Sequence, residues 1–341
     1  MSARANIRDV SARAGVSVKT VSRVLNGHRY VSPETRARVE QAMADLNFRP
    51  SVAARILAGT KSGQIALIYD NHSPYYINAI QMGCWQRCHE ASVRLLAQPV
   101  DVSDRDVGDQ VRGLVRETQV DGIILSSPVT DCPAVLDALD ALDLPFVRIS
   151  PGTDHALTAS VYMDDAQAAD DMTAHLVAHG HRRIGFVKGH RNHTASEERL
   201  FGYRRALDRA GITFEPQLVV QGAFDYDSGV RAGRQLLALP QRPTAIFASN
   251  DDMAAGVLSV AHAQGVAVPA RLSVAGFDDT ELARMVWPQL TTIKQPTHDL
   301  AYTAAGLLLD GEGTGHRRLD HQLVERASVA AVPAIEREGQ A

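Results

Sequence analysis

The sequence lacks several features that would define its class at once. No apolar run approaches the roughly 18 residues that a membrane-spanning helix needs, and the first ten residues, MSARANIRDV, lack the apolar stretch of a secretory signal. Cysteine is scarce: there are three residues, Cys84, Cys88 and Cys132, an odd count without the C-x-x-C spacing of a metal-ligand pair. We therefore expect a cytoplasmic protein with no membrane partner, no disulfide framework and no zinc site.

Motifs that carry common catalytic chemistry are also missing. The sequence contains no G-x-S-x-G, no G-x-x-x-x-G-K, no H-E-x-x-H, and no G-x-G-x-x-G after the first predicted strand. His179 and His181 flank a predicted helix-stop glycine, and His190 and His193 fall on a predicted loop without acids at a fixed spacing. We expect neither an enzyme nor a metal site, and no cofactor.

The charge is distributed unevenly along the 341 residues. Residues 1–62 contain eleven Lys or Arg against four Asp or Glu, a net charge of +7, and the total of −4 leaves −11 for the remainder. A basic head on an acidic body indicates a polyanionic partner at one end of the chain. A solvated basic face is the alternative that charge alone leaves open.

The head predicts three short helices. Asn6 is a candidate cap for the first and Gly15 a stop, Ser17 caps the second, Gly27 ends it, and SPET at 32–35 opens the third with a serine and a proline. Apolar residues at helical spacing would form a small common core: Ile7, Val10, Ala14, Val21, Val24, Leu25, Val39, Met43 and Leu46.

Two short helices around a glycine turn, with a third behind them, form a helix-turn-helix whose second helix fits the major groove of DNA. The outward side of that helix carries Val18, Lys19, Ser22, Arg23 and Asn26. Lysine and arginine reach guanine edges or phosphates, and valine contacts a thymine methyl group. A purely structural three-helix unit is the alternative, but it would not need the basic excess.

The segments IRDVSARAGVSVKTVSRVLNG and VSPETRARVEQAMADLNFRPSVAARILAG resemble the DNA-binding head of the LacI/GalR (lactose and galactose repressor) family through residue 59. The resemblance implies a DNA-binding domain over residues 1–48 that reads bases with Val18, Lys19 and Arg23. It also implies phosphate or supporting contacts from Ser17, Thr20, Ser22 and Asn26. Since the family varies the pair at the helix start, the operator sequence cannot be taken from a relative.

Residues 49–62 follow the head. By the same resemblance they form a hinge helix that folds when two copies pair on DNA, with Leu57 wedged into the minor groove and the small Ala54 permitting close approach. A plain linker is the alternative for so short a segment.

The body alternates short apolar segments with helical ones. Eight buried strands are predicted, at 65–70, 93–99, 121–127, 144–150, 183–189, 217–222, 244–250 and 272–279. This pattern predicts an α/β body of two parallel-sheet, Rossmann-like lobes, as in periplasmic binding proteins, with a ligand cleft at the carboxyl ends of the strands.

Polar and aromatic residues recur at those strand ends. An arginine, an amide, a carboxylate and aromatic rings suit a polyhydroxylated ligand, although each residue alone could be a cap or a turn. The family resemblance implies an effector site at Arg199, Asn250 and Asp278, with aromatic positions Tyr75, Tyr76 and Phe224. It adds Asp164, with a one-residue shift within YMDDAQ as the open alternative.

The resemblance extends to about residue 332. It implies a first lobe at 63–162 plus 293–323 and a second at 163–292 plus 324–335. A C-terminal leucine heptad is missing, so we expect a homodimer. These features predict a sequence-specific transcriptional regulator, a repressor of a near-palindromic operator on double-stranded DNA, controlled by a small-molecule effector such as a sugar or glycoside. A two-lobed solute-binding protein without a regulatory role is the alternative.

Overall fold

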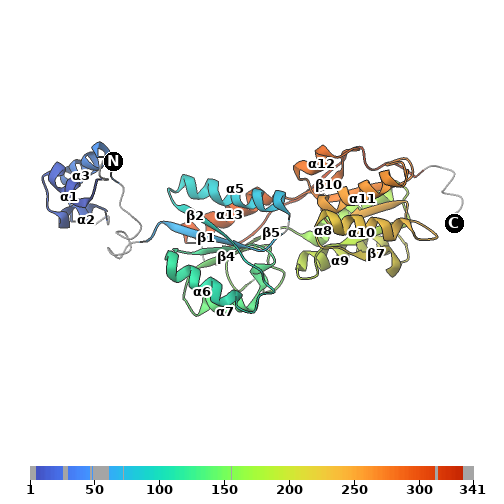
Figure 1. Cartoon of the computed structure of the whole chain (residues 1–341), viewed down its shortest axis with the longest axis horizontal. Coiled ribbons are helices and arrows are strands. Elements are labelled where there is room, and N and C mark those ends of the chain that lie inside the picture. Colours follow the sequence, from blue (N-terminus) through green and yellow to red (C-terminus); the bar gives the residue numbers. More distant parts are fainter. Residues whose placement is uncertain are drawn as a thin grey trace. The chain divides into compact units, whose positions relative to one another are not determined.

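A computed structural model describes residues 5–25, 30–46, 48, 61–71, 73–154, 156–311 and 314–332 of the chain (Figure 1). The chain divides into two compact units. One is the segment up to Gln64 together with Leu114–Asp121, and the other is the remainder. No helix within the described ranges is long and apolar enough to cross a membrane.

The head contains the three predicted helices, and local hydrogen bonds explain where they begin. They are α1 (Ile7–Ala14), α2 (Val18–Leu25) and α3 (Pro33–Asp45). Asn6 caps α1 in a reciprocal capping box with Asp9, and Gly15 ends the helix in the left-handed conformation that glycine adopts without strain. The Ser17 hydroxyl accepts from the Thr20 N–H at 3.1 Å at the start of α2. The predicted helix ends at Asn6, Gly15, Ser17 and Ser32 are confirmed, and the predicted end of α2 at Gly27 lies outside the described residues.

The core of the head follows the predicted helical spacing. Val10, Val21 and Val39 are fully buried, one from each helix. Val24, Ala14 and Ala42 complete the buried cluster, and the partly buried residues packed against it include Ile7, Leu25, Met43 and Leu46. Because Val21 and Val24 point inward, the opposite side of α2 is left facing outward.

The body holds two six-stranded sheets, one in each lobe (Figure 1). The first has the order β11-β5-β4-β3-β1-β2, and the second has the order β12-β10-β9-β8-β6-β7. The strands of the first lobe are β1 (Gln64–Tyr69), β2 (Arg94–Pro99), β3 (Ile123–Leu125), β4 (Phe146–Ile149), β5 (Ser160–Tyr162) and β11 (His316–Arg318). Those of the second are β6 (Ile184–Lys188), β7 (Val219–Gln221), β8 (Ala245–Ala248), β9 (Ser273–Asp278), β10 (Thr291–Lys294) and β12 (Gln322–Val324). The central pairs run parallel, and β12 pairs antiparallel with β10.

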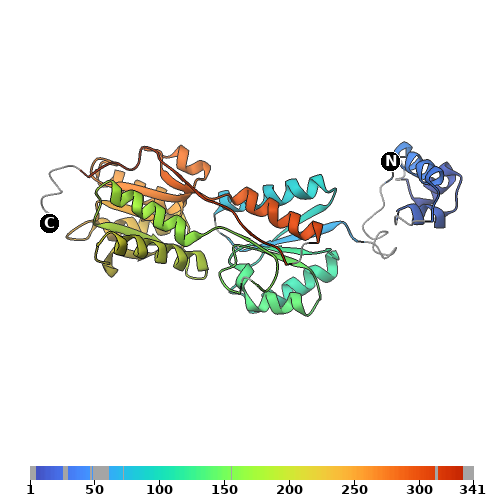
Figure 2. The same cartoon turned by 180° about the vertical axis from the view of Figure 1, so that it is seen from behind.

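Helices cover both faces of each sheet, which confirms the predicted α/β architecture (Figures 1 and 2). In the first lobe, α5 (Pro74–Glu90) and α13 (Thr297–Asp310) lie on one face, and α6 (Val107–Thr118) and α7 (Pro133–Asp140) on the other. In the second, α8 (Asp165–Ala178) packs with α9 (Thr194–Arg209), and α10 (Tyr226–Leu237) packs with α11 (Asp251–Ala263). The short elements are α12 (Glu281–Met285) and the 3₁₀ turns Val129–Asp131 and Pro216–Leu218.

Two predictions about strands need correction. The strands β2 and β7 lie at sheet edges and are partly exposed, so they are not buried as predicted. Four further strands, β5, β10, β11 and β12, were not predicted as strands. Each has three or four residues, too few for a periodic pattern, and pairing with distant segments defines them.

The chain crosses between the lobes three times. The crossings follow β5, β10 and β11. The predicted lobe boundaries at 293 and 323 therefore need correction, because they fall inside β10 and β12, which both belong to the second sheet. A boundary placed from a short apolar segment misses the hydrogen bonds that assign that segment to a sheet.

Candidate functional site

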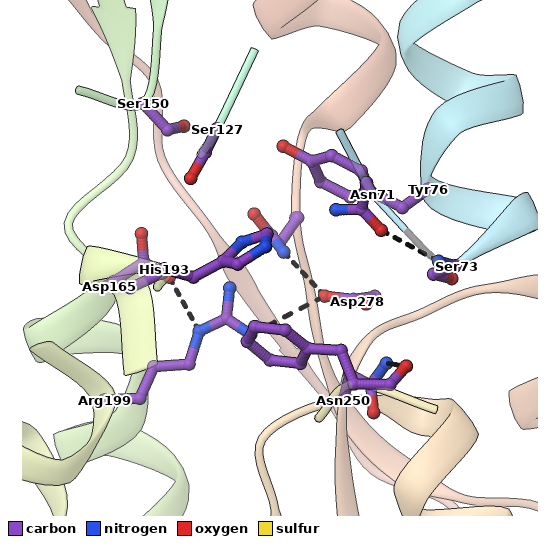
Figure 3. Close-up of a pocket in the computed structure, with 13 residues that line it drawn as sticks. Asn71, Ser73, Tyr76, Ser127, Ser150, Asp165, His193, Arg199, Asn250 and Asp278 are labelled. Carbon is purple, nitrogen blue, oxygen red and sulfur yellow. Dashed lines mark hydrogen bonds and ion pairs between the residues drawn. The ribbon is translucent and has the colours of Figure 1, made fainter. Parts of the chain in front are cut away.

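A pocket lies between the two lobes, where the carboxyl ends of the strands face each other (Figure 3). The first lobe lines it with residues that follow β1, β3 and β4, namely Asn71, Ser73, Tyr76, Ser127 and Ser150. The second lobe contributes Asp165, His193, Ala195, Arg199, Phe224, Asn250 and Asp278, and Gln295 follows β10. The space left between them is about 40 Å³, little more than a water or two needs. The lobes are thus nearly closed on each other.

Arg199 is the cation of this pocket, and other groups of the second lobe hold it in place. Its Nε donates to Asp165 at 2.8 Å, and its Nη1 donates to the carbonyl oxygen of Ser249. The guanidinium carbon lies 3.6 Å from the ring centroid of Phe277 and 5.7 Å from that of Phe224. Ion pairing and stacking on aromatic faces fix the guanidinium before any ligand arrives.

Asp278 is a buried carboxylate at the end of β9. It accepts from Gln295 Nε2 at 2.6 Å and lies 4.0 Å from Arg199 Nη1 (Figure 3). Its φ of 113° and that of 62° at Phe224 are uncommon for residues with a side chain. Backbone strain of this kind collects at ligand sites, where the surrounding structure imposes it.

Burial raises the pKa of Asp278 to about 7, although the Arg199 guanidinium and the Gln295 hydrogen bond oppose that rise. Burial also raises the pKa of the neighbouring Asp251, and the charge of Asp278 adds to that effect. A carboxylate with a raised pKa binds its proton more tightly in the folded chain than in the unfolded chain. The stabilisation that this proton gives is complete below about pH 4 and is lost as pH rises through about 7.

We therefore expect Asp278→Asn to flatten part of the pH profile of stability. The free energy of unfolding of the wild type should fall relative to the variant between about pH 4 and pH 7, because only the wild type loses the buried proton there. Urea unfolding across this range measures the difference. Asp320→Asn, which removes an exposed carboxylate, is the control. Parallel profiles for the wild type and Asp278→Asn would contradict the assignment.

Asn250 organises the second lobe around the pocket. Its Oδ1 accepts from the Met253 N–H and caps α11, and its Nδ2 donates to the Phe224 carbonyl at 2.9 Å. A second bond from Nδ2 reaches Asp252 at 3.2 Å. Asn250 therefore supports the strained backbone that carries the Phe224 ring over the pocket.

The first lobe lines the pocket with a different kind of group from the second lobe. Tyr76, Ser127 and Ser150 present hydroxyl groups, and none of these hydroxyls has a hydrogen-bond partner among the described residues. Ser127 is nonetheless buried. The two walls meet directly where Ser73 Oγ donates to Asp252 Oδ2 at 2.9 Å, joining the starts of α5 and α11. A polar ligand would give hydrogen-bond partners both to the hydroxyls of the first lobe and to the charged groups of the second lobe.

The structure brings together five of the seven predicted site residues: Tyr76, Arg199, Phe224, Asn250 and Asp278. Tyr75 does not line the pocket. Asp164 lies outside it and caps α8 by accepting from the Gln167 N–H, so the one-residue shift that the sequence left open places Asp165 at the pocket. Sequence reasoning missed Asn71, Ser73, Ser127, Ser150, His193, Ala195 and Gln295. Ser127 and Ser150 are the last residues of two predicted strands, and this place at the carboxyl end of a strand is the signal that could have identified them.

A second candidate surface lies on the outward side of α2. Val18 is 41% exposed, Lys19 and Arg23 are exposed, and neither cation forms an ion pair with a described residue. Ser17 and Thr20 bond each other at the helix start, which favours a supporting role, and Ser22 is half-buried. The predicted contacts at Asn26, Ala54 and Leu57 lie outside the described residues, as does most of the predicted hinge.

Two other arginines of the head have partners within it. Arg13 pairs with Asp45 at 2.8 Å, joining the end of α1 to the end of α3, and Arg36 donates to the Val24 carbonyl at 3.4 Å. Unlike these two arginines, Lys19 and Arg23 on α2 have no ion-pair partner among the described residues. A helix of this size with exposed cations and an exposed apolar residue fits the major groove.

Two parts of the chain match known protein families. Residues 6–51 match the family described as "Bacterial regulatory proteins, lacI family", and residues 173–329 match "Periplasmic binding protein-like domain". The first match covers the three head helices, and the second covers most of the second lobe and the segments that return through the first.

Relatives that match over nearly the whole chain are consistent with these two family matches. A protein of Photobacterium profundum described as "HTH-type transcriptional repressor PurR" is 35% identical over 335 residues, covering 95% of this chain and 98% of that protein. The crystal structure of the lac repressor dimer bound to operator and the anti-inducer ONPF is 30% identical, with a TM-score of 0.82, over 96% of this chain and 100% of that one. A complex of the transcriptional regulator CelR with cellobiose is 31% identical, with a TM-score of 0.73, over 95% of this chain and 100% of that one.

Proposed function

Because this chain belongs to the LacI family of bacterial regulatory proteins and is a DNA-binding transcriptional repressor, we propose that it binds a near-palindromic operator as a homodimer and that a small-molecule effector in the pocket between the lobes controls this binding. The observation that carries the proposal is the combination of two sites in one chain. The outward face of α2 offers unpaired cations, and the pocket offers charged groups together with three hydroxyls that no described residue satisfies. A regulator needs both sites, whereas a solute-binding protein needs only the second.

Lys19, Arg23 and Val18 are the proposed base-reading residues. Each projects from the side of α2 opposite the buried Val21 and Val24, so DNA contact does not require the head core to open. Arginine and lysine bond guanine O6 and N7, and the valine methyl groups suit a thymine methyl. Ser17, Thr20, Ser22 and Asn26 are the proposed phosphate or supporting contacts.

Exposed apolar side chains of the body support a homodimer. Met82 and Trp85 project from α5 with 45% and 49% exposure, and Met285 and Trp287 are 68% and 78% exposed around the end of α12. Large apolar groups left exposed on both lobes mark surfaces that another chain covers. A second copy would repeat the head and so match a two-fold operator.

A sugar or glycoside is the proposed effector class. The pocket combines a fixed guanidinium, carboxylates and hydroxyls with the rings of Tyr76 and Phe224, a set that suits a ring with polar edges and an apolar face. The related regulator CelR, described in complex with cellobiose, supports the same class.

The difference between the two walls of the pocket suggests how effector binding moves the lobes relative to each other. The second lobe is organised in advance by Arg199, Asp165 and Asn250, so it can hold a ligand before the lobes close. The hydroxyls of Ser127 and Ser150 then gain partners only if the first lobe approaches. A ligand with more contacts in the closed form shifts the population of lobe arrangements, and this shift reaches DNA through the chain that precedes β1.

Selection of binding sites from a random duplex library tests the DNA part of this proposal. The full chain should enrich an inverted repeat whose half-sites lie about one helical turn, roughly 34–36 Å, apart. Enrichment of single, unrepeated half-sites would contradict the homodimer. No enrichment over input, with or without the candidate effectors, would contradict operator recognition itself.

A further inference from the structure

An arginine lies in the interior of the first lobe, in a strand whose other residues are apolar. Arg148 belongs to β4 and is fully buried, with 0% of its surface exposed. Side chains alternate along a strand, so Val147 and Ile149 pack into the core beside α13, whereas Arg148 points to the opposite face of the sheet. A strand needs only an apolar side chain at that position, and burying a guanidinium is unfavourable unless its N–H groups find partners.

Arg148 finds these partners in two segments that follow neighbouring strands. The first segment is the turn after β3, where the Thr130 carbonyl accepts from Nε at 2.9 Å and Asp131 Oδ1 accepts from Nη2 at 2.7 Å. The second is the loop after β4, where the carbonyls of Thr153 and Asp154 accept from Nη2 at 2.8 Å and from Nη1 at 2.7 Å. One side chain therefore joins both segments.

Asp131 is the counter-ion of Arg148 and links the same two segments from the other side. Its Oδ2 accepts from the Gly152 N–H at 2.9 Å, and its Oδ1 accepts from the Thr153 hydroxyl at 3.2 Å. The Asp131 side chain is itself only 14% exposed, so solvent screens this ion pair little. Both partners of the ion pair thus hold the backbone of the loop after β4.

The two segments that the ion pair joins carry hydroxyl groups of the first lobe at the pocket. Ser127 precedes the turn after β3, Ser150 begins the loop after β4, and both line the pocket (Figure 3). Ser150 and Asp154 have φ angles of 50° and 41°, which are uncommon for residues with a side chain. Such conformations persist where surrounding contacts impose them, and the bond from Arg148 to the Asp154 carbonyl is such a contact.

The loop after β4 is also a contact between the two lobes. Gly152 lies against Thr194 at the start of α9, because a Cβ at position 152 would be only 2.1 Å from Thr194 Cβ. The same helix carries Arg199, the cation of the pocket. The position of this loop therefore determines how closely the lobes approach each other, and Asp131 fixes that position through the Gly152 N–H.

We propose that Arg148 and Asp131 are a positioning pair for lobe closure. The pair holds the segments of Ser127 and Ser150 as one unit and presents Gly152 to the start of α9. Neither member of the pair lines the pocket, so both act through the backbone that they hold. The inference rests on the proposed effector function, in which the arrangement of the lobes controls operator binding, and adds the residues that shape the closing surface of the first lobe.

Hydrogen exchange of the full chain without ligand tests this proposal. Asp131→Asn keeps the size of the side chain but replaces one acceptor atom by a donor, so it cannot accept from both Arg148 and the Gly152 N–H as the carboxylate does. Exchange should rise at least about 10-fold in residues 152–154 and at least about 3-fold in the first turn of α9, and stay within about two-fold in β1. Asp137→Asn, which changes an exposed carboxylate of α7 in the same lobe, is the matched control.

Two further variants test the two steps of this action separately. Arg148→Lys keeps the positive charge, but one ammonium group cannot reach all four acceptors, so it should loosen residues 152–154 as Asp131→Asn does. Gly152→Ala leaves the positioning pair intact and places a methyl group against Thr194, so exchange should rise in the first turn of α9 and not in β1. Gly113→Ala is its control, because a Cβ there meets no atom within 4 Å.

A purely structural ion pair would give a different pattern of exchange. A rise in β1 as large as that in residues 152–154, or unchanged exchange in the first turn of α9 for Asp131→Asn, would overturn the positioning role and leave the effector function standing. The second lobe is the decisive readout, since loosening of the first lobe alone does not reach it.

Operator titration of the same variants separates this inference from the function beneath it. If the arrangement of the lobes controls operator binding, Asp131→Asn and Gly152→Ala should shift operator affinity in the same direction by at least about 5-fold. Asp137→Asn and Gly113→Ala should leave it unchanged. Unchanged operator affinity in all four variants, together with the expected exchange, would support the positioning pair and overturn the proposed control of DNA binding by the lobes.

Discussion

Arg199→Ala is expected to abolish the response of operator binding to the effector and to destabilise the body. The side chain holds Asp165 at 2.8 Å and lies beside Asp278, so its removal leaves buried carboxylates without a counter-charge. Breaking a buried ion pair by removing one partner costs about 3–5 kcal/mol. Because the head forms its own core, affinity for the operator without effector should stay close to that of the wild type at temperatures where the variant is folded.

Two measurements separate these effects. Chemical unfolding reports the loss of stability, and operator titration with and without a bound effector reports the loss of response. Arg199→Lys serves as the control, because it keeps the positive charge and loses the planar group that stacks on Phe277. It should regain most of the stability and little of the response. An Arg199→Ala protein that still responds to the effector would remove Arg199 from the site.

Arg23→Ala is expected to weaken binding to the selected operator by about 1–3 kcal/mol and to relax base preference at one position of each half-site. The side chain is exposed on α2 and has no ion-pair partner among the described residues, so the head should keep its stability. Lys19→Ala should act in the same direction. Fluorescence anisotropy with the operator and with a scrambled duplex, at several salt concentrations, measures both affinity and specificity.

Arg13→Ala is the matched control in the head. It removes an exposed arginine that pairs with Asp45 and lies outside α2, so it should alter affinity for both duplexes only slightly. Equal losses on operator and scrambled DNA for Arg23→Ala would mean that Arg23 contacts phosphate and reads no base. In that case Val18 and Lys19 would remain the proposed readers of sequence.

The head was predicted in detail because its structure is local. Asn6, Gly15 and Ser17 act within a few residues of themselves, and Val21 and Val24 lie one helical turn apart. Caps and helical spacing follow from neighbouring residues, so a single sequence displays them. The central strands of the body were found for a similar reason, since a buried parallel strand is a continuous apolar run.

The candidate site was predicted only in part. Arg199, Asn250 and Asp278 belong to distinctive segments, whereas Ser127 and Ser150 are ordinary serines whose place in a pocket depends on two sheets facing each other. Asp164 and Asp165 are adjacent and identical in kind. Only the start of α8 decides that the first caps the helix and the second pairs with Arg199.

By itself, the sequence determined that a basic helical head precedes an acidic α/β body of two lobes, and which face of α2 is outward. Tertiary structure alone decided the short strands β5, β10, β11 and β12, the edges of the lobes, and which residues of the two lobes line the pocket together. A local sequence pattern is enough for a helix or strand that interactions within a few residues stabilise. Two other features depend on contacts that no local pattern records. One is the pairing of strands of three or four residues, and the other is contact between side chains more than a hundred positions apart, such as Ser73 and Asp252.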